Sequence, residues 1–268
     1  MLIDINAYVG HWPFRKMKFN TCEGLLKQMD RFGVDISVVA NLNGIFYKNT
    51  QSANRELYSE IRSARRFSGR IVPFAVINPT YAGWRNDFKE SVDQFGMKGL
   101  RLYPKYHDYD ISDPSLVELV KMARDRDIPV AFTIRMVDSR QRSWMDIDYV
   151  AGTAKPEWSL TNIMPIIHLV PDAKYMILNV ANGVQIKDND AEVFRKAKIL
   201  LDTSGRSLNE LGGILKSNGS DRFAFGSHSP LSDYLTGRLR IESMRESEAD
   251  EQTKELLRSS NAQRFLKL

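Results

Sequence analysis

The chain has 268 residues, of which 43% are hydrophobic and 26% are charged, and its formal net charge is +5. This size fits one globular domain, and no composition shift or repeat divides residues 1–268. No apolar run approaches the ~20 residues that a bilayer span needs, and acidic residues are interspersed with the basic ones, so neither a membrane nor a nucleic acid is expected as a partner.

The cysteine content and the first residues bear on location. Cys22 is the only cysteine, so no internal disulfide can form. The first four residues, Met1-Leu2-Ile3-Asp4, lack the basic-then-apolar pattern of a signal peptide. We therefore expect a cytoplasmic protein.

Short apolar runs alternate with amphipathic segments along the chain. The runs are typical of buried strands, and we expect them at 2–6, 34–40, 70–77, 97–103, 128–134, 174–181, 199–203 and 222–226. Capping residues and a helical period mark the segments between them. Helices are expected at 21–32, 51–67, 80–94, 112–126, 159–170, 191–198 and 207–217, followed by three further pieces at 232–241, 247–259 and 261–266.

This strict alternation predicts a parallel sheet with helices outside it. Eight strand–helix pairs in about 250 residues favour a single (β/α)8 TIM barrel, here with extra C-terminal helices. A doubly wound open sheet is the alternative. That fold would call for a glycine-rich phosphate loop after an early strand, and neither G-x-G-x-x-G nor G-x-x-x-x-G-K-[ST] occurs in the chain.

In a barrel of this type, functional side chains lie where each strand ends at its carboxyl side. The residues expected there are rich in amides, guanidinium groups and aromatic rings. They are Asn6, Tyr8 and His11; Arg101, Tyr103, Lys105 and His107; Thr133, Arg135, Asp138 and Arg140; Val180; Asp202 and Ser204; and Ser227, His228 and Ser229.

Several short motifs are similar to those of the amidohydrolase-related family of the amidohydrolase superfamily. The matching segments are Ile3-Asp4-Ile5, Asn78-Pro79, the run from Lys98 to Pro104, Ile128-Pro129-Val130, Ile177-Leu178 and Phe225-Gly226-Ser227 with Ser229-Pro230. The resemblance implies a (β/α)8 barrel that hydrolyses C–N or C–O bonds, or decarboxylates, with one or two divalent metals.

The chain departs from this family at the metal ligands. The family's His-x-His at strand 1 corresponds to Asn6-Ala7-Tyr8, its later histidines to Thr133 and Val180, and its strand 8 aspartate to His228. A catalytic zinc site needs at least three protein ligands with available lone pairs. We therefore expect no metal at the family position and no other cofactor. A site rebuilt from His11, His107 and His228, together with Asp202, stays open as an alternative.

The basic and aromatic residues indicate the kind of substrate. Arg101, Lys105, Arg135 and Arg140 follow two neighbouring strands, and guanidinium groups bind carboxylate or phosphate in a bidentate way. Tyrosines around Tyr103 can support a sugar or an aromatic ring. The predicted binding residues for a small anionic substrate are Asn6, His11, Arg101, Tyr103, Lys105, His107, Arg135 and Arg140. Alternatively, the arginines form a structural network with Asp108, Asp138 and Asp202.

For catalysis we expect His228 and Asp202 to act as an acid–base pair, since an imidazole and a carboxyl group both suit proton transfer. The leading hypothesis is an amidohydrolase-like hydrolase or lyase for a small anionic substrate, a sugar acid or an aromatic acid. The alternative is an inactive barrel that binds a small acid or a protein partner. A homodimer is left open.

Overall fold

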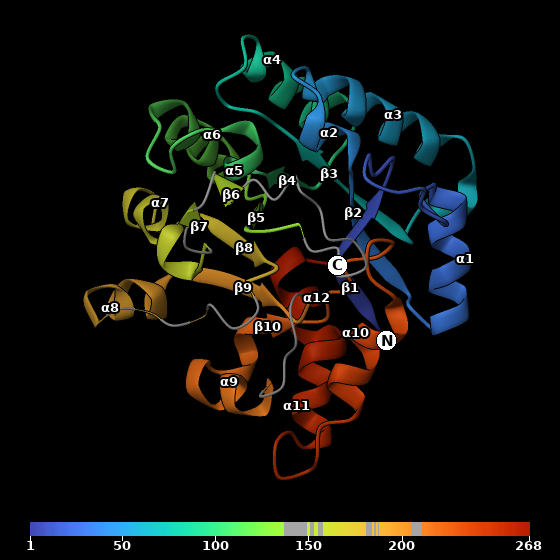
Figure 1. The fold of residues 1–268 in the computed structure, drawn as a ribbon, viewed down its shortest axis with the longest axis vertical. Helices are drawn as coiled ribbons and strands as arrows, with labels where there is room; N and C mark the ends of the chain where they lie inside the picture. Colours follow the sequence, from blue (N-terminus) through green and yellow to red (C-terminus); the bar gives the residue numbers. More distant parts are fainter. Residues whose placement is uncertain are drawn as a thin grey trace.

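The structure is a computed structural model that describes residues 1–136, 149–150, 153–154, 158–180, 184, 186, 188–204 and 211–268. Eight parallel strands form one curved sheet with helices around it (Figure 1), which confirms the predicted (β/α)8 barrel. In the order of the sheet they are β1 (Ile3–Val9), β2 (Ile36–Asn41), β3 (Ile71–Val76), β4 (Gly99–Leu102), β5 (Val130–Thr133), β8 (Lys174–Leu178), β9 (Lys198–Asp202) and β10 (Phe223–Ala224). A separate antiparallel pair joins β6 (Tyr149–Val150) to β7 (Thr153–Ala154).

Backbone hydrogen bonds between β1 and the end of the β10 segment close the ring. Ile5 N donates to Phe225 O at 2.9 Å, His228 N to Asn6 O at 2.8 Å, and Tyr8 N to Ser229 O at 2.8 Å. The carboxyl ends of β1 and of the β10 segment therefore lie side by side. This closure brings His228 next to Asn6, although the two residues are far apart in the sequence.

Twelve helices are described between and after these strands. They are α1 (Cys22–Phe32), α2 (Asn43–Phe46), α3 (Thr50–Arg62), α4 (Trp84–Lys89), α5 (Pro104–His107), α6 (Pro114–Asp125), α7 (Met164–Leu169), α8 (Asp188–Lys196), α9 (Leu211–Asn218), α10 (Tyr234–Glu242), α11 (Glu251–Glu255) and α12 (Asn261–Leu266). Short 3-10 or π segments lie at Arg65–Phe67, Glu90–Gln94, Leu160–Asn162, Ser220–Arg222 and Leu256–Ser260. In the described part of the chain, no helix has both the length and the apolar character to span a membrane.

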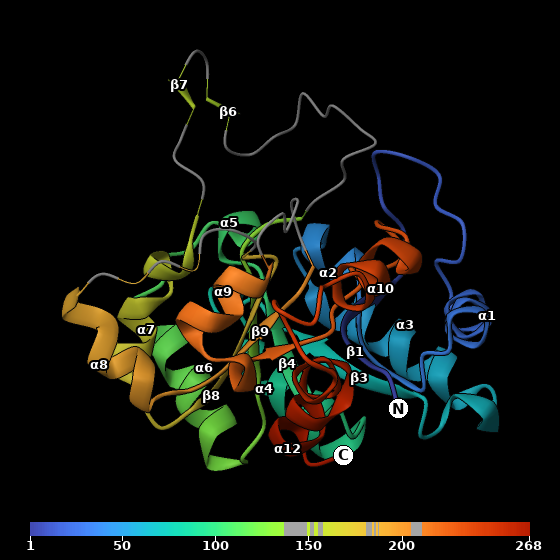
Figure 2. The same ribbon diagram turned by 90° about the horizontal axis from the view of Figure 1, so that it is seen from below.

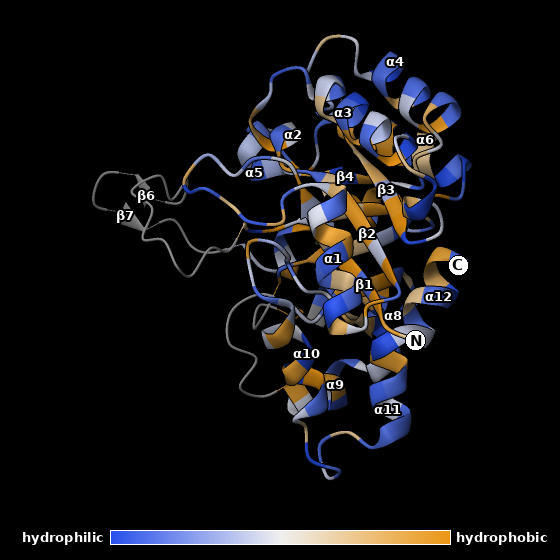
Figure 3. Ribbon diagram, turned by 90° about the vertical axis from the view of Figure 1, so that its right-hand side faces the viewer, coloured by the Kyte–Doolittle hydropathy of each residue, from blue (hydrophilic) through white to orange (hydrophobic). Residues whose placement is uncertain are grey.

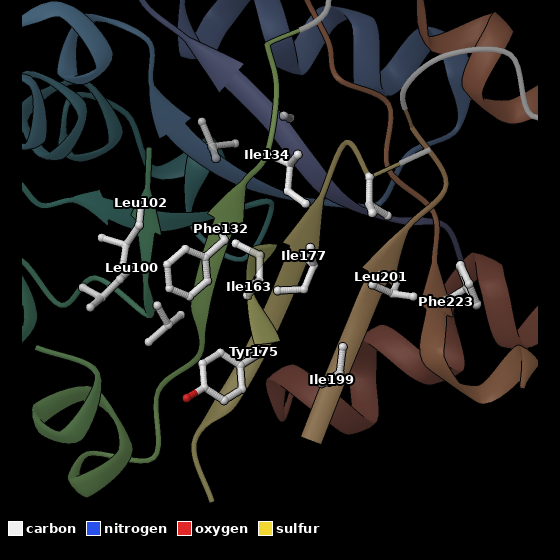
Figure 4. Close-up of a cluster of buried hydrophobic side chains, with 14 of the residues drawn as sticks. Leu100, Leu102, Phe132, Ile134, Ile163, Tyr175, Ile177, Ile199, Leu201 and Phe223 are labelled. Atoms are coloured by element: carbon white, nitrogen blue, oxygen red, sulfur yellow. The ribbon is translucent and has the colours of Figure 1, made fainter. Parts of the chain in front are cut away.

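Alternate residues of each strand serve two different apolar layers. Outward residues such as Leu100 and Phe132 pack between the strands and the helices (Figure 4). Inward residues such as Phe74 and Met176 fill the barrel interior. Apolar residues are concentrated in the strands and polar ones on the outer helix faces (Figure 3). Because the side-chain period of a strand is two residues, Arg101 points inward between its outward neighbours on β4.

One end of the barrel is closed by the C-terminal helix. Ala262 of α12 is fully buried among the inward residues Ile3, Ile5 and Leu200, and Phe265 packs against the same cluster. Figure 2 shows α12 at the opposite end of the barrel from α2 and α5. The predicted C-terminal helices therefore have a defined place, and the polar residues at the carboxyl strand ends face the other way.

An irregularity in β1 directs two successive side chains into the barrel. The pairing of β1 with β2 shifts register between Asp4 and Ala7. Ile5 belongs to the inner apolar cluster, and Asn6 hydrogen-bonds to residues of β4 and β9. A β-bulge allows this departure from strict alternation, so Asn6 reaches the barrel axis.

The helix boundaries differ from the expected ones at a few places. The loop 41–50 contains α2, and the helix expected at 80–94 begins only at Trp84, after Gly83 with its φ of 90°. Pro165 stands in the first turn of α7 and lacks an N–H, so the helix expected at 159–170 is a 3-10 turn followed by α7. The helix expected at 112–126 begins at Pro114, and Asp113 caps it by accepting from Ser115 N.

Candidate active site

Asn6 is the centre of a buried polar network at the carboxyl ends of the strands. Its Nδ2 lies 2.5 Å from Asn179 Oδ1, 2.6 Å from Asp202 Oδ2 and 2.9 Å from Ser204 Oγ. On its other side, Oδ1 accepts a hydrogen bond from Arg101 Nη1 at 2.8 Å. A guanidinium can only donate, so this bond fixes which end of the Asn6 amide faces Asp202.

Asp202 ends β9 and has only 3% of its surface exposed. One oxygen accepts from Asn179 N at 2.8 Å, and the other is bonded to Ser204 Oγ and Asn6 Nδ2. Burial nevertheless raises the pKa of Asp202 to about 6, because loss of water disfavours the charged form more than these bonds and the Arg101 charge favour it. This carboxyl group can therefore gain or lose a proton near neutral pH.

Asn179 connects Asp202 to His228. Its Nδ2 lies 2.9 Å from His228 Nδ1 and 3.4 Å from Nε2. The imidazole is 1% exposed and packs edge-on against the Tyr8 ring, with 5.3 Å between the centroids. Asn179 and His228 both have positive φ angles, of 60° and 59°. Left-handed backbone at residues other than glycine is enriched at functional sites. The two predicted catalytic residues are thus joined through one residue, because the backbone N–H of Asn179 donates to Asp202 and its side-chain amide bonds to His228.

Arg101 lies fully buried inside the barrel. Its Nη1 donates to Asn6 Oδ1, to the Tyr8 hydroxyl at 3.0 Å and to Thr133 Oγ1 at 3.2 Å. Its Cζ lies 4.8 Å from the centroid of the Tyr8 ring. Among the described residues, Nε and Nη2 have no hydrogen-bond partner. The predicted structural pairing with Asp138 falls outside the described residues, and Asp202 is reached only through Asn6.

A second carboxylate, that of Asp4, lies next to the network and fixes the backbone around it. Asp4 accepts from Asn6 N and Ser227 N, both at 2.9 Å, and from Ser227 Oγ at 2.5 Å. These bonds tie β1 to the segment that carries His228. Burial raises the pKa of Asp4 as well, but these hydrogen bonds are to groups of Asn6 and Ser227. These bonds hold the two sides of the site together.

Aromatic side chains line the neighbouring part of the barrel mouth. Tyr8, Trp12 and Tyr103 are buried in one cluster with apolar residues of β2, β3 and the loop after β1. Trp12 contacts Phe14 and Phe46 at centroid distances of 5.0 Å and 5.7 Å. Burial raises the pKa of Tyr103 well above its usual value, so it stays a neutral phenol.

The contacts described for His11, His107 and Lys105 lie outside this network. His11 is exposed, and its backbone N donates to Asn43 Oδ1. His107 Nε2 bonds to Gly44 O at 3.0 Å, and burial lowers the pKa of its ring. Lys105 lies over the Trp158 ring, with 5.9 Å from Nζ to the centroid. Arg135 follows β5 and is half-buried. Arg140 lies outside the described residues.

The alternative metal site from His11, His107 and His228 is not assembled. Within the described ranges, no group of three or more His, Cys, Asp or Glu side chains is placed to hold a metal ion. The three histidines are an exposed loop residue, a ring bonded to a backbone carbonyl, and a member of the Asn6 network.

Sequence reasoning did not single out Asn179 as a site residue. The motif comparison pointed to Val180, which is one position further along and makes no polar side-chain contact. The available signal was an asparagine directly after an apolar strand, a residue type that tolerates left-handed backbone. Tyr8, Thr133 and Ser204 are the other members of the network that were expected at strand ends without a binding role.

These features define the class of molecule: a (β/α)8 barrel whose carboxyl end holds a buried network of amides, one carboxyl, one imidazole and one guanidinium. No protein-family model matches the sequence, and no curated protein matches it. Solved structures do match over the whole chain. One is a provisionally assigned amidohydrolase from Staphylococcus aureus, 16% identical, with a TM-score of 0.72 over 100% of this chain and 99% of that one.

Two further matches are decarboxylases. The 2,6-dihydroxybenzoate decarboxylase complexed with 2,6-dihydroxybenzoate is 15% identical, with a TM-score of 0.73 over 100% of this chain and 99% of that one. The dihydroxybenzoic acid decarboxylase of Polaromonas sp. JS666, with bound manganese and the inhibitor 2-nitroresorcinol, is 14% identical, with a TM-score of 0.71 over 100% and 97%. These matches confirm the (β/α)8 fold that the motif resemblance implied.

Proposed function

We propose that this protein is a hydrolase or lyase that acts on a small aromatic acid bound at the carboxyl end of the barrel. The observation that carries the proposal is the Asn6 network, in which a carboxyl group with a pKa of about 6 and a buried guanidinium bond to the same amide. Such a pair offers a proton-transfer group and a fixed positive charge next to each other.

Asp202 is the proposed proton-transfer residue, with His228 beside it. A pKa near the working pH allows a group both to accept and to donate a proton during turnover. His228 is linked to Asp202 through Asn179, so a change of charge at one group is felt by the other. An aromatic substrate is favoured over a sugar acid by the rings of Tyr8, Trp12 and Tyr103, and by the fold neighbours, whose names refer to aromatic acids.

The proposal includes no resident divalent metal. The residues at the positions of the family ligands do not fit one, because Arg101 Nη1 donates to the oxygens of Asn6, Tyr8 and Thr133. A metal ion needs the lone pairs that these hydrogen bonds use, and the guanidinium charge repels it. Val180 offers no lone pair at all. We therefore derive no step through a metal.

The proposal predicts loss of turnover in Asp202→Asn and His228→Gln. Each variant should lower kcat on the active substrate by about 100-fold or more, because general acid–base catalysis contributes 10²–10⁴-fold. A panel of dihydroxybenzoates, other aromatic acids, sugar acids and lactones would be screened by chromatography of the products. His168→Gln is the matched control, since His168 is exposed on α7 and bonds to Asp190; its kcat should be unchanged.

Metal dependence is tested in the same assay. Turnover should survive chelation and dialysis, and the protein should carry far less than one equivalent of manganese or zinc. A loss of turnover on chelation that manganese restores would contradict the metal-free part of the proposal. Melting curves of both variants separate lost chemistry from lost folding.

The second candidate function is binding of a small acid without any reaction, and one observation favours it. Both oxygens of Asp202 are already engaged by groups of the chain itself, namely Asn179, Asn6 and Ser204. If the panel yields ligands that raise the melting temperature but no product, this reading replaces the enzymatic one.

A further inference from the structure

Arg101 places a permanent positive charge in the barrel with one edge of its guanidinium unpaired. The side chain is fully buried. Nη1 is bonded to Asn6, Tyr8 and Thr133, whereas Nε and Nη2 have no hydrogen-bond partner within the described part of the chain. A buried donor left unpaired is destabilising, and more so when it is charged. The unpaired edge therefore requires an acceptor.

The described residues do not supply a carboxylate to this edge. Asp202 is close enough for the Arg101 charge to lower its pKa against the effect of burial, but the Asn6 amide lies between the two groups. Desolvating an ion costs several kcal/mol unless it is paired with good geometry. An anion that pairs with this edge therefore has to come from outside the described residues.

The identity of the two unpaired atoms indicates the shape of that anion. In a planar guanidinium, the Nε and Nη2 hydrogens lie on the same edge and point in nearly the same direction. This edge matches the two oxygens of a carboxylate, which it binds through two parallel hydrogen bonds. The orientation of the edge is fixed in advance by the three Nη1 bonds and by the Tyr8 ring, which lies 4.8 Å from Cζ.

We propose that the Nε–Nη2 edge of Arg101 binds the carboxylate of the substrate side-on. The inference rests on the proposed function, for which it names the chemical group by which the aromatic acid is held. A monoanion is favoured over a phosphate dianion, because one guanidinium balances one negative charge and Asp202 adds a second negative charge when it is ionised. Trp12 Nε1 is a further buried donor without a partner among the described residues.

Calorimetry of the intact protein with benzoate and with benzamide tests the inference. The two ligands have the same shape, but benzamide lacks the charge and one acceptor. Benzoate should bind about 10–100-fold more tightly than benzamide, the range that a charged hydrogen-bond pair provides. Arg101→Lys should lose a similar factor for benzoate, since lysine keeps the charge but not the two-donor edge. Phenyl phosphate should bind more weakly than benzoate.

A nitrogen-15 spectrum of the wild-type protein provides a readout that does not depend on the variant folding. The Arg101 Nε–H signal should shift when benzoate is added and stay in place with benzamide. Arg66→Lys is the matched control, since Arg66 is exposed and paired with Glu23; its affinity for benzoate should equal that of the wild type.

Three outcomes would overturn the inference: equal affinity for benzoate and benzamide, unchanged benzoate affinity in a folded Arg101→Lys variant, or no binding of benzoate or 2,6-dihydroxybenzoate. None of these measurements needs turnover. Carboxylate binding at Arg101 without any product from the substrate panel would leave this inference standing and remove only the proposed activity.

Discussion

The carboxyl group of Asp202 accepts three hydrogen bonds and still has a raised pKa. Asn6, Asn179 and Ser204 donate to it, and each of these bonds favours the ionised form. Complete burial outweighs them. At the scale of single residues, the ionised form of Asp202 is therefore energetically unfavourable in the folded protein. The fold tolerates this charge because the surrounding side chains are fixed by their own contacts.

This raised pKa predicts how stability depends on pH. The pKa of Asp202 is about 6 in the folded protein and 3.8 at its ordinary value. The folded state then holds the proton more tightly than the unfolded state, so the stabilisation from Asp202 is complete below pH 3.8 and is lost as pH rises to about 6. A pKa difference of about two between the folded and unfolded states changes the free energy of unfolding by roughly 3 kcal/mol.

Urea unfolding of the wild type and of Asp202→Asn at a series of pH values measures this term. The free energy of unfolding of the variant relative to the wild type should rise between pH 4 and pH 6 and stay level above that. Asn cannot titrate, so any pH-independent cost of the substitution appears only as a constant offset. A flat difference across this interval would show that the carboxyl group is ionised at its ordinary pKa.

At the scale of elements, α9 contains two successive glycines in different surroundings. A Cβ on Gly213 would meet no atom within 4 Å, whereas a Cβ on Gly212 would lie 2.7 Å from Glu248 Cβ. Glycine inside a helix costs about 0.5–1 kcal/mol relative to alanine. Gly213→Ala should therefore raise the free energy of unfolding by up to about 1 kcal/mol.

Gly212→Ala is the matched control for this prediction. The same gain in helix propensity is offset there by the contact with Glu248, so its stability should stay below that of Gly213→Ala. Denaturant titration of the two variants at one pH gives the comparison. Equal stabilisation of both would mean that Glu248 moves away at no cost.

The elements show which parts of the fold could be predicted from sequence and which could not. Strands buried on both faces form short apolar runs, so β2 and β8 were evident in the sequence. The four-residue helix α2 was missed because its Gly44 is required by a distant contact: a Cβ there would lie 2.8 Å from Val76. In the site, His228 and Asp202 were predicted as one pair, whereas Asn179, whose position directly after an apolar strand was its only signal, was missed; the structure shows it bonded to both.

At the scale of the whole molecule, Asn261 attaches the closing helix to the barrel. It is fully buried, and its Nδ2 donates to Ser220 O and Phe223 O, each at 2.8 Å. Asn261→Ala leaves two carbonyl oxygens without this donor. The free energy of unfolding should fall by about 1–3 kcal/mol, as measured by urea titration.

Gln263→Ala serves as the comparison, because the only hydrogen bond described for the Gln263 side chain, on the same helix, is to the sulfur of Met1. Its free energy of unfolding should match that of the wild type. A loss of equal size in both variants would assign the effect to helix propensity rather than to the bonds from Asn261.

The ring of strands is closed by contacts between segments that are synthesised far apart in time. β1 is synthesised before the other seven strands of the sheet, yet it pairs with the segment around Ser229 and is covered by Ala262 of α12. Its apolar residues Ile3 and Ile5 stay uncovered until α12 has been synthesised. Nascent chains that stall before α12 would therefore expose the first strand to chaperones and to other unfinished copies.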